Sequence, residues 1–374
     1  MFDNLKFILD RSAELGIPGM ELLVYQDGKE AFHEVRGVRD EEGTPLRTNE
    51  KFNIYSCSKP ITCAAALTLL EEGKISLDDD LSDYIPAFGD VKVVKNGGIF
   101  KAEKNIKLRQ LFTMTAGLSY SVDSPEVHSG IADTEGRCPT VKMMDYIAKM
   151  PLLYEPGESW FYSLAHDVIA AVVEIASGKR FGLYVKEKIF DPLGMNDSTF
   201  LLPEDEVDQL PMQYKGTPEG VVPVPYKTIG KYKLGSEYES GGAGCVTNAR
   251  DYLKFLEAMR NEKILSRETL DLMYSNHLND VQRAASWVPK GYSYGLGVRV
   301  PDASGRRTDI GWGGAAGAFL ALDEQHGISL FYTQHVLTSP NKNLRKDIIE
   351  AAKLDLGYDA FTEDMYHGEA SHLA

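Results

Sequence analysis

The sequence predicts an α/β fold: an antiparallel sheet flanked by helices and formed by both chain ends, with an inserted, mostly helical domain. Three observations predict this fold class. A helix and a strand hairpin open the chain, a long helical stretch runs from about Pro60 to Ser286, and strand patterns return after Gly291. Because sheets and helices must bury their apolar faces against one another, the two groups of strands are expected to share one sheet.

The first elements are a helix and a hairpin. Apolar residues at helical spacing predict a helix over residues 2–15, which Pro18 and Gly19 end. Residues 20–25 and 29–38 are predicted as two strands joined by Asp27-Gly28. This dipeptide readily takes the positive φ angles of a tight hairpin turn.

The remaining elements divide the chain into two domains. Helices are predicted over residues 62–72, 168–176 and 249–259, strands over 294–300, 318–323 and 328–334, and a last amphipathic helix over 342–354. We expect residues 1–59 and 287–374 to form the sheet domain and residues 60–286 the helical domain. Ligand sites favour clefts between domains, so the active site is expected there.

The composition excludes several classes of function. The chain has 374 residues, of which 40 are basic and 55 acidic, and its net charge of −15 argues against binding to nucleic acid or to an anionic membrane surface. No apolar run reaches the about 18 residues of a membrane span. The N-terminus lacks the basic start and the apolar stretch of a signal peptide, so a cytoplasmic location is expected.

Cysteines and histidines predict no metal site and no disulfide. The four cysteines form no Cys-x-x-Cys pair and are expected to be reduced thiols. The histidines form no cluster with metal-binding spacing. We therefore expect neither a metal nor another cofactor.

The most informative motif is Ser56-x-x-Lys59, which precedes an alanine-rich apolar run. Residues three apart lie on the same face of a helix, so the Lys59 amine can stand beside the Ser56 hydroxyl. The helix N-terminus adds unpaired N–H groups, which suit a nucleophile whose attack creates an oxyanion. Pro60 fits the first helical turn, where its missing N–H has no helical partner. The motif therefore indicates a nucleophilic serine with a neighbouring base.

The spacing alone is a weak signal. Ser339 and Lys342 repeat it, and there we interpret Ser339 as a helix cap, because Pro340 suits the first helical position. For Ser56 taken by itself, a capping serine with a surface lysine is the competing interpretation.

Six further motifs support the catalytic interpretation, because they follow one another in the order that a known family shows. They lie at residues 106–118, 154–163, 189–195, 240–244, 294–297 and 311–317. With Ser56-x-x-Lys59 they make nearly the whole chain resemble the serine β-lactamase-like superfamily, which includes class C β-lactamases, penicillin-binding proteins, D-amino-acid-releasing peptidases and family VIII esterases. The resemblance implies a β-lactamase/transpeptidase-like fold and catalysis through an acyl-enzyme.

Two differences from the family's motifs argue against a β-lactam as the substrate. Residues 162–164 read Tyr-Ser-Leu and lack the asparagine of the family's Tyr-x-Asn. Residues 312–314 read Trp-Gly-Gly where lactamases and peptidases have Lys-Thr-Gly or His-Thr-Gly, which removes a cation that could bind a substrate carboxylate. Both features resemble family VIII carboxylesterases and related acyltransferases. They imply a small-molecule carboxylic ester as substrate, with transfer of the acyl group to another alcohol as a close variant of hydrolysis.

The resemblance also implies roles for individual residues. Ser56 attacks the ester carbonyl, neutral Lys59 accepts the serine proton, and Tyr162 passes a proton to the leaving alcohol. The backbone N–H groups of Ser56 and Ala315 form the oxyanion hole. The expected substrate-binding residues are Trp312, Gly313, Gly314, Tyr55 and His166.

Some of these substrate-binding residues have competing interpretations. Gly313 and Gly314 let the strand approach the substrate closely, and Trp312 lines the acyl or alcohol pocket. A plain core aromatic is the alternative for Trp312, and a structural histidine is the alternative for His166.

A second possible nucleophile motif is rejected because the secondary structure predicted around it does not fit. Gly291-x-Ser293-x-Gly295 matches the nucleophile elbow of α/β-hydrolases, and Asp323 and His335 follow in the correct order. That elbow needs a strand, a sharp turn and a helix, whereas residues 296–300 continue as an alternating strand.

Two other functions fit the same fold. One is a β-lactamase or D-amino-acid peptidase, which would need export and is disfavoured by the missing signal segment. The other is a non-catalytic penicillin-recognising module, which would have no need of Ser56, Lys59 and Tyr162 together. The sequence leaves the natural ester, the acyl acceptor and the oligomeric state open.

Overall fold

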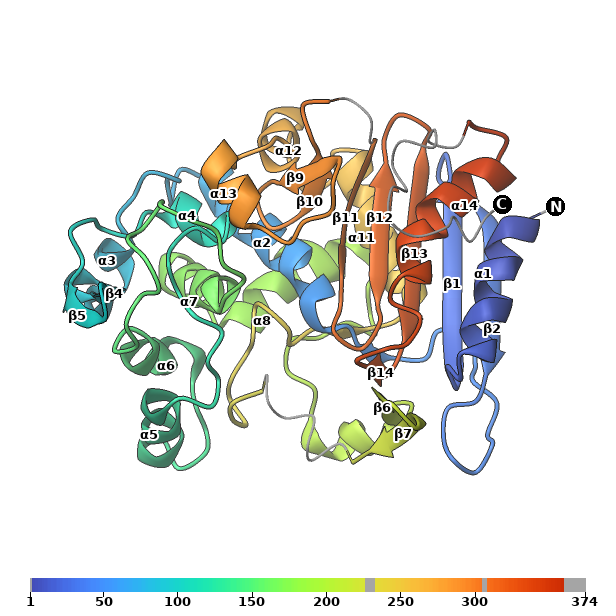
Figure 1. Cartoon of the computed structure of the whole chain (residues 1–374), viewed down its shortest axis with the longest axis horizontal. Coiled ribbons are helices and arrows are strands. Elements are labelled where there is room, and N and C mark those ends of the chain that lie inside the picture. Colours follow the sequence, from blue (N-terminus) through green and yellow to red (C-terminus); the bar gives the residue numbers. More distant parts are fainter. Residues whose placement is uncertain (1, 226–232, 305–307, 360–374) are drawn as a thin grey trace.

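The computed structural model describes residues 2–225, 233–304 and 308–359 (Figure 1). Its main sheet has seven strands in the order β2-β1-β13-β12-β11-β10-β9, all paired antiparallel. Two strands come from the start of the chain and five from its end, which confirms the predicted fold class. The strands are β1 (Gly19–Gln26), β2 (Lys29–Gly37), β9 (Tyr292–Tyr294), β10 (Arg299–Pro301), β11 (Asp309–Gly313), β12 (Phe319–Asp323) and β13 (Ile328–Gln334).

Strand β1 joins the two ends of the chain. It pairs with β13 from Met20, opposite Gln334, to Gln26, opposite Ile328, and it pairs with β2 through the predicted hairpin. Asp27-Gly28 has positive φ at both residues, as the tight turn requires. β1 is buried along most of its length, which explains its nearly continuous apolar sequence.

Helices cover both faces of this sheet (Figure 1). On one face, α1 (Asp3–Glu14) packs against α14 (Ile348–Asp355), and both share an apolar core with β1, β12 and β13. On the other face, α11 (Ala249–Arg260) contacts β1 and β13. The sheet is therefore the middle layer of three.

Two local predictions near the chain end were wrong. Ser339 does not cap the last helix, because a 3-10 turn, η5 (Leu344–Asp347), leads into α14 instead. The Ser339 hydroxyl donates to Asn341 Oδ1 and accepts from Gln334 Nε2, so a buried polar network takes its place. The strand predicted over residues 294–300 is a hairpin of β9 and β10, because Gly297, with φ +81°, reverses the chain.

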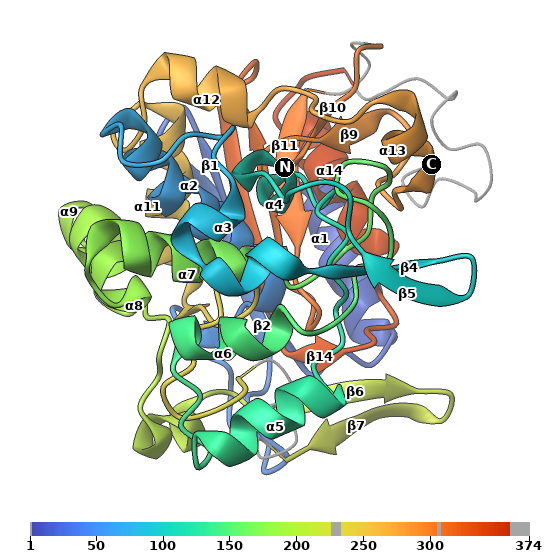
Figure 2. The ribbon, with the colours of Figure 1, turned by 90° about the vertical axis from the view of Figure 1, so that its left-hand side faces the viewer.

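The inserted segment is mostly helical, and Figure 2 looks onto it. No helix within the described ranges combines the length and the apolar character that a membrane span requires. The division into two domains stays a prediction, and residues 360–374 of the predicted sheet domain lie outside the described part. The helices are α2 (Ser58–Glu71), α3 (Leu81–Tyr84), α4 (Leu108–Phe112), α5 (Pro125–Asp133), α6 (Thr140–Ile147), α7 (Ala165–Ser177), α8 (Phe181–Val185), α9 (Asp191–Leu193), α12 (Arg267–Met273) and α13 (Asp280–Ala285).

Short elements complete the chain and connect its larger parts. Of these, η1 contacts both α2 and β11, so it places the start of α2 beside the main sheet, while β3 pairs with β8. The short strands are β3 (Phe52–Asn53), β4 (Lys92–Lys95), β5 (Gly98–Lys101), β6 (Gln213–Thr217), β7 (Gly220–Val224), β8 (Val246–Thr247) and β14 (Val336–Leu337). The short helical turns are η1 (Tyr55–Cys57), η2 (Pro86–Asp90), the π-helical η3 (Lys186–Phe190) and η4 (Glu204–Gln209).

Helix α2 is the centre of the helical part. All its residues from Ser58 to Leu69 are buried, and it packs against α7. A helix that is apolar on every side must be enclosed by the protein. Side chains at its first turn are therefore held on a rigid support, which suits a site that needs exact geometry.

Candidate active site

Ser56 lies in the turn η1, where the chain passes from β3 into α2. Its neighbour Tyr55 has φ +48°, a left-handed conformation that is uncommon for a bulky residue. The Tyr55 N–H donates a 3.0 Å hydrogen bond to Asn53 Oδ1, which supports this turn. The turn leaves Ser56 with 8% of its surface exposed at the N-terminal end of α2. Pro60 lies in the first turn of α2, where its missing N–H costs nothing.

Lys59 contacts Ser56 as the motif predicted. Its Nζ lies 3.2 Å from Ser56 Oγ and donates a 2.6 Å hydrogen bond to the carbonyl oxygen of Gly242. The side chain is completely buried. A neutral amine has two N–H donors and one lone pair, so it can donate to Gly242 and still accept the proton of Ser56.

Tyr162 is the third group at the same oxygen. Its hydroxyl donates a 2.6 Å hydrogen bond to Ser56 Oγ. The Tyr162 ring stacks on Tyr120 with centroids 5.4 Å apart, and Lys59 Nζ lies 4.6 Å from its centroid. The structure thus brings the three predicted catalytic side chains together, and their catalytic roles stay a prediction.

The end of β11 lies against the segment that carries the nucleophile. A Cβ placed on Gly314 would stand 2.3 Å from the carbonyl oxygen of Ile54, so only glycine permits this approach. A Cβ on Gly313 would meet no atom nearer than 3.7 Å. The N–H of Ala315 donates to no backbone carbonyl of the described chain. These features place the end of β11, next to the predicted oxyanion-hole residue Ala315, beside the segment that carries Ser56.

Two predicted substrate-binding residues are enclosed by the protein. His166 is fully buried, and neither ring nitrogen has a hydrogen-bond partner among the described residues. Burial lowers the pKa of His166 well below its usual range, so its imidazole is neutral. The Tyr55 hydroxyl donates 2.7 Å to Gln213 Oε1 inside the protein. Neither side chain lies on an open surface.

Sequence reasoning missed the partner of Lys59. The resemblance implies a glycine-rich loop at residues 240–244, but a run of glycines does not tell which backbone carbonyl points to Lys59. Buried Asp167 holds this loop by accepting hydrogen bonds from Ser240 Oγ and Tyr238 Oη. Burial raises the pKa of Asp167, while the hydrogen bonds from Ser240 and Tyr238 oppose the rise.

Sequence reasoning also missed two tryptophans near Tyr162. The rings of Trp287 and Trp160 lie 5.2 and 6.4 Å from the Tyr162 ring, and the predicted Trp312 lies 6.0 Å away. Trp160 directly precedes the Tyr162 motif, but Trp287 is remote in sequence. Only the fold brings it to the site.

The rejected motif around Ser293 forms no triad. Ser293 is buried in β9, and its hydroxyl donates to Asn276 Oδ1. Asp323 binds Lys353 and Thr308, and His335 bonds to the carbonyl oxygen of Pro211. No group of three or more potential metal ligands occurs among the residues that the structure describes.

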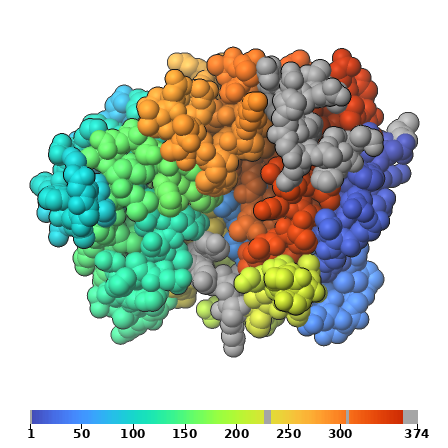
Figure 3. Space-filling model, viewed as in Figure 1, coloured from blue at the N-terminus to red at the C-terminus, as the bar shows by residue number. Residues whose placement is uncertain are grey.

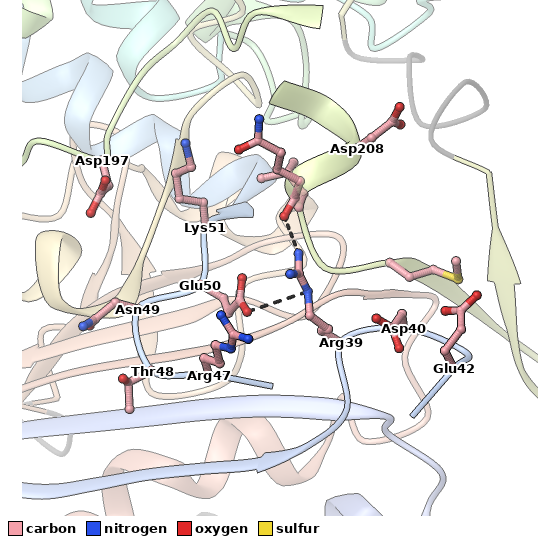
Figure 4. A pocket seen from close by; sticks show the side chains of 13 residues that line it. Arg39, Asp40, Glu42, Arg47, Thr48, Asn49, Glu50, Lys51, Asp197 and Asp208 are labelled. Carbon is pink, nitrogen blue, oxygen red and sulfur yellow. Dashed lines mark hydrogen bonds and ion pairs between the residues drawn. The ribbon is translucent and has the colours of Figure 1, made fainter. Parts of the chain in front are cut away.

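The molecular surface is hollowed between the green helical part and the red strands, below the orange segment (Figure 3). A separate pocket of about 770 Å³ lies between the loop that follows β2 and the segment around η4 (Figure 4). Arg39 crosses it, pairing with Glu50 and donating to the carbonyl oxygen of Gln209. None of the three catalytic candidates lines this pocket, so it is distinct from the site at Ser56.

Comparisons with known proteins agree with this geometry. The chain is 29% identical to Esterase EstB of Burkholderia gladioli, with 85% of this chain and 86% of the esterase covered. It is 27% identical to Lovastatin esterase of Penicillium rubens, with 79% and 75% covered. The solved structure of EstCE1, described as a hydrolase with promiscuous acyltransferase activity, superposes with a TM-score of 0.78 at 26% identity, covering 93% of this chain and 98% of that one.

These relatives and the family comparison confirm the predicted resemblance and the predicted fold. The model of the family described as Beta-lactamase matches residues 6–353, which include every strand of the main sheet and all three side chains that meet at Ser56. The chain therefore belongs to the Beta-lactamase family.

Proposed function

We propose that this chain is a serine hydrolase of small carboxylic esters that forms an acyl-enzyme on Ser56. The main support for the proposal is that two groups contact Ser56 Oγ. Lys59 Nζ lies 3.2 Å from this oxygen and Tyr162 Oη lies 2.6 Å from it. The esterase names of EstB and Lovastatin esterase support an ester as substrate.

Acylation begins when neutral Lys59 takes the proton of Ser56. The serine oxygen bonds to the ester carbonyl carbon, and the carbonyl oxygen becomes an oxyanion that accepts hydrogen bonds from the N–H groups of Ser56 and Ala315. The bond from that carbon to the alcohol oxygen then breaks. Tyr162 gives its proton to the leaving alcohol and is reprotonated by Lys59.

Deacylation repeats these proton transfers in reverse. Water gives up a proton through Tyr162 and Lys59, attacks the acyl carbon and releases the carboxylic acid together with free Ser56. When another alcohol attacks instead of water, the product is a new ester. The described acyltransferase activity of EstCE1 supports this transfer as a close variant.

The test compares two substrates and four proteins. Hydrolysis of a short-chain p-nitrophenyl ester and of a chromogenic cephalosporin is measured for wild type, Ser56→Ala, Lys59→Ala and Ser293→Ala, with intact mass to detect an acyl-enzyme. We expect ester turnover to vanish in the first two variants and to survive in Ser293→Ala. Activity that depends on Ser293 would overturn the nucleophile, and cleavage of the cephalosporin alone would overturn the substrate class. A stable β-lactam adduct without any turnover would favour the recognition module.

A further inference from the structure

All three tryptophans of the chain gather around Tyr162. Trp287 follows α13 and is 61% exposed, yet its ring lies 5.5 Å from both Trp160 and Trp312 and 5.2 Å from Tyr162. Tyr294 closes the cluster, with its ring 5.0 Å from Trp312 and 5.8 Å from Trp160. An exposed tryptophan that packs on a catalytic tyrosine gives an incoming ligand an open aromatic surface.

The same cluster contains three unsatisfied hydrogen-bonding groups. Trp160 Nε1, Trp312 Nε1 and Tyr294 Oη are buried and have no hydrogen-bond partner in the described ranges. These side chains are only 3%, 5% and 0% exposed. Buried polar groups in native proteins nearly always find a partner, so such a group without one requires an explanation. Two indole N–H donors and a phenol in one cluster could bind the acceptor oxygen of a ligand when a ring of the cluster moves aside to admit it.

The position of the cluster indicates which half of an ester it contacts. In the proposed mechanism Tyr162 gives its proton to the leaving alcohol, so that alcohol must stand beside the Tyr162 hydroxyl. Trp287, Trp312 and Trp160 surround the ring of the same tyrosine. The alcohol half of the ester is therefore the half nearest to these rings.

We propose that Trp160, Trp287, Trp312 and Tyr294 form a subsite for an aromatic alcohol group that carries an ether or carbonyl oxygen. The inference rests on the proposed function and specifies its substrate class. Aromatic rings gain stacking energy beyond the burial of their area. The oxygen substituent supplies the acceptor that the indole N–H groups lack. A cationic group would supply no acceptor, although aromatic cages can bind cations.

The first test isolates aromaticity in the alcohol half. Benzyl acetate and cyclohexylmethyl acetate have alcohol groups of similar size and similar leaving ability, and only the first is aromatic. We expect wild type to prefer benzyl acetate by about three- to tenfold in kcat/KM, and Trp287→Leu to reduce this preference to below about twofold. Because Trp287 is 61% exposed, its replacement leaves the core intact. Val281→Ala, which changes a 66% exposed residue of α13, is the matched control and should keep the preference.

The second test separates the two halves of the ester. Ethyl phenylacetate and ethyl cyclohexylacetate vary the acyl group in the same way. We expect no preference above about twofold between them and no effect of Trp287→Leu on their ratio. A preference that depends on Trp287 only in this acyl pair would overturn the assignment to the alcohol half. Equal rates within both pairs would overturn the aromatic subsite.

The third test detects binding without turnover. The three tryptophans are the only ones in the chain and all lie in this cluster, so intrinsic tryptophan fluorescence reports on the proposed subsite alone. In Ser56→Ala, 4-methoxybenzyl acetate should change the fluorescence saturably and bind about three- to tenfold more tightly than 4-ethylbenzyl acetate, which lacks the acceptor oxygen. Trp160→Phe keeps a ring but removes one N–H donor, and should reduce this difference. Equal binding of the two esters would overturn the role of the indole donors.

The outcomes distinguish this inference from the proposed function. Suppose that cyclohexylmethyl acetate is hydrolysed in a Ser56-dependent way while neither ester pair shows a preference. The proposed serine esterase function would then be supported, and the proposed aromatic subsite would be overturned. If no ester is hydrolysed, the proposed function fails, whereas the fluorescence titration still decides whether the aromatic alcohol binds.

Discussion

The Tyr162 hydroxyl donates a 2.6 Å hydrogen bond to Ser56 Oγ, although the two residues are 106 positions apart in the chain. Lys59 Nζ approaches the same oxygen at 3.2 Å from one helical turn away. Two elements of the helical part, α2 and the segment before α7, thus determine the geometry of the nucleophile. In the proposed mechanism Lys59 takes the proton of Ser56 and Tyr162 protonates the leaving alcohol, so a mutation of Tyr162 tests its contribution separately.

Removing the Tyr162 hydroxyl should affect turnover and leave the fold unchanged. Tyr162→Phe keeps the ring that stacks on Tyr120 but removes the hydroxyl proposed to protonate the leaving alcohol. We expect kcat for an alkyl ester to fall by about 10²- to 10⁴-fold, with little change in KM. Tyr120→Phe is the matched control and should retain most of the activity. Equal losses in the two variants would contradict a proton-transfer role for Tyr162.

The adjacent glycines of β11 should respond differently to the same substitution. Gly314→Ala would place a methyl group 2.3 Å from the carbonyl oxygen of Ile54 and displace the segment that carries Ser56. We expect a loss of stability of about 1 to 3 kcal/mol and a large fall in kcat. Gly313→Ala meets no atom nearer than 3.7 Å and should unfold at nearly the wild-type temperature.

Kinetics distinguish the two glycine variants further. If the Gly313 backbone faces the substrate, Gly313→Ala should raise KM more than it lowers kcat. Thermal unfolding followed by circular dichroism, together with steady-state kinetics, checks both expectations. A Gly314→Ala variant as stable and active as wild type would show that β11 is not tightly packed against Ile54.

His335 should make the protein sensitive to acid. Burial lowers the pKa of His335 from its ordinary 6.5 to about 4, so between these pH values the unfolded chain binds a proton that the folded chain does not. The contribution of His335 to the free energy of unfolding is therefore complete above pH 6.5 and is lost as the pH falls through that window. Its size is about 3 kcal/mol.

Denaturant unfolding at several pH values measures this contribution. His335→Gln should lose less stability than wild type between about pH 7 and pH 4. His128→Gln changes an exposed histidine and should leave the pH dependence as it is. A wild-type stability that does not change over this window would contradict the prediction.

The cysteines should be unreactive in the native protein. All four are free and buried, and burial raises the pKa of the Cys57, Cys63 and Cys245 thiols well above the usual range. We expect slow reaction with an aromatic disulfide reagent in buffer and rapid reaction of all four thiols in denaturant. Fast modification of the native protein would show that the core around Cys63 opens readily.

Much of the fold could be predicted because its elements carry strong local signals. The turn at Asp27-Gly28 and the periodicity of α1, α7 and α11 are properties of short segments. The break between β9 and β10 was missed because it depends on Gly297, whose positive φ has no signature within a run of strand-like residues. The predicted cap at Ser339 was wrong because its hydroxyl bonds to Gln334, at the end of β13. Such a contact is invisible to a local pattern.

The candidate site shows the same limit. Ser56 and Lys59 are one turn apart, so helix geometry predicted their contact, while Tyr162 was found through the resemblance. The carbonyl of Gly242 and the ring of Trp287 reach the site through the tertiary fold alone. Burial of His166 likewise follows from packing that no single segment specifies.

The pairing of β1 with β13 has a consequence for synthesis on the ribosome. Met20 and Gln334 face each other in the finished sheet, so β1 must wait until residue 334 has been translated before its second edge is paired. Ser56 is also made long before Ala315, its proposed partner in holding the oxyanion. We therefore expect nascent chains to lack hydrolytic activity, to need protection of an apolar strand edge, and to become active only after β13 has been translated.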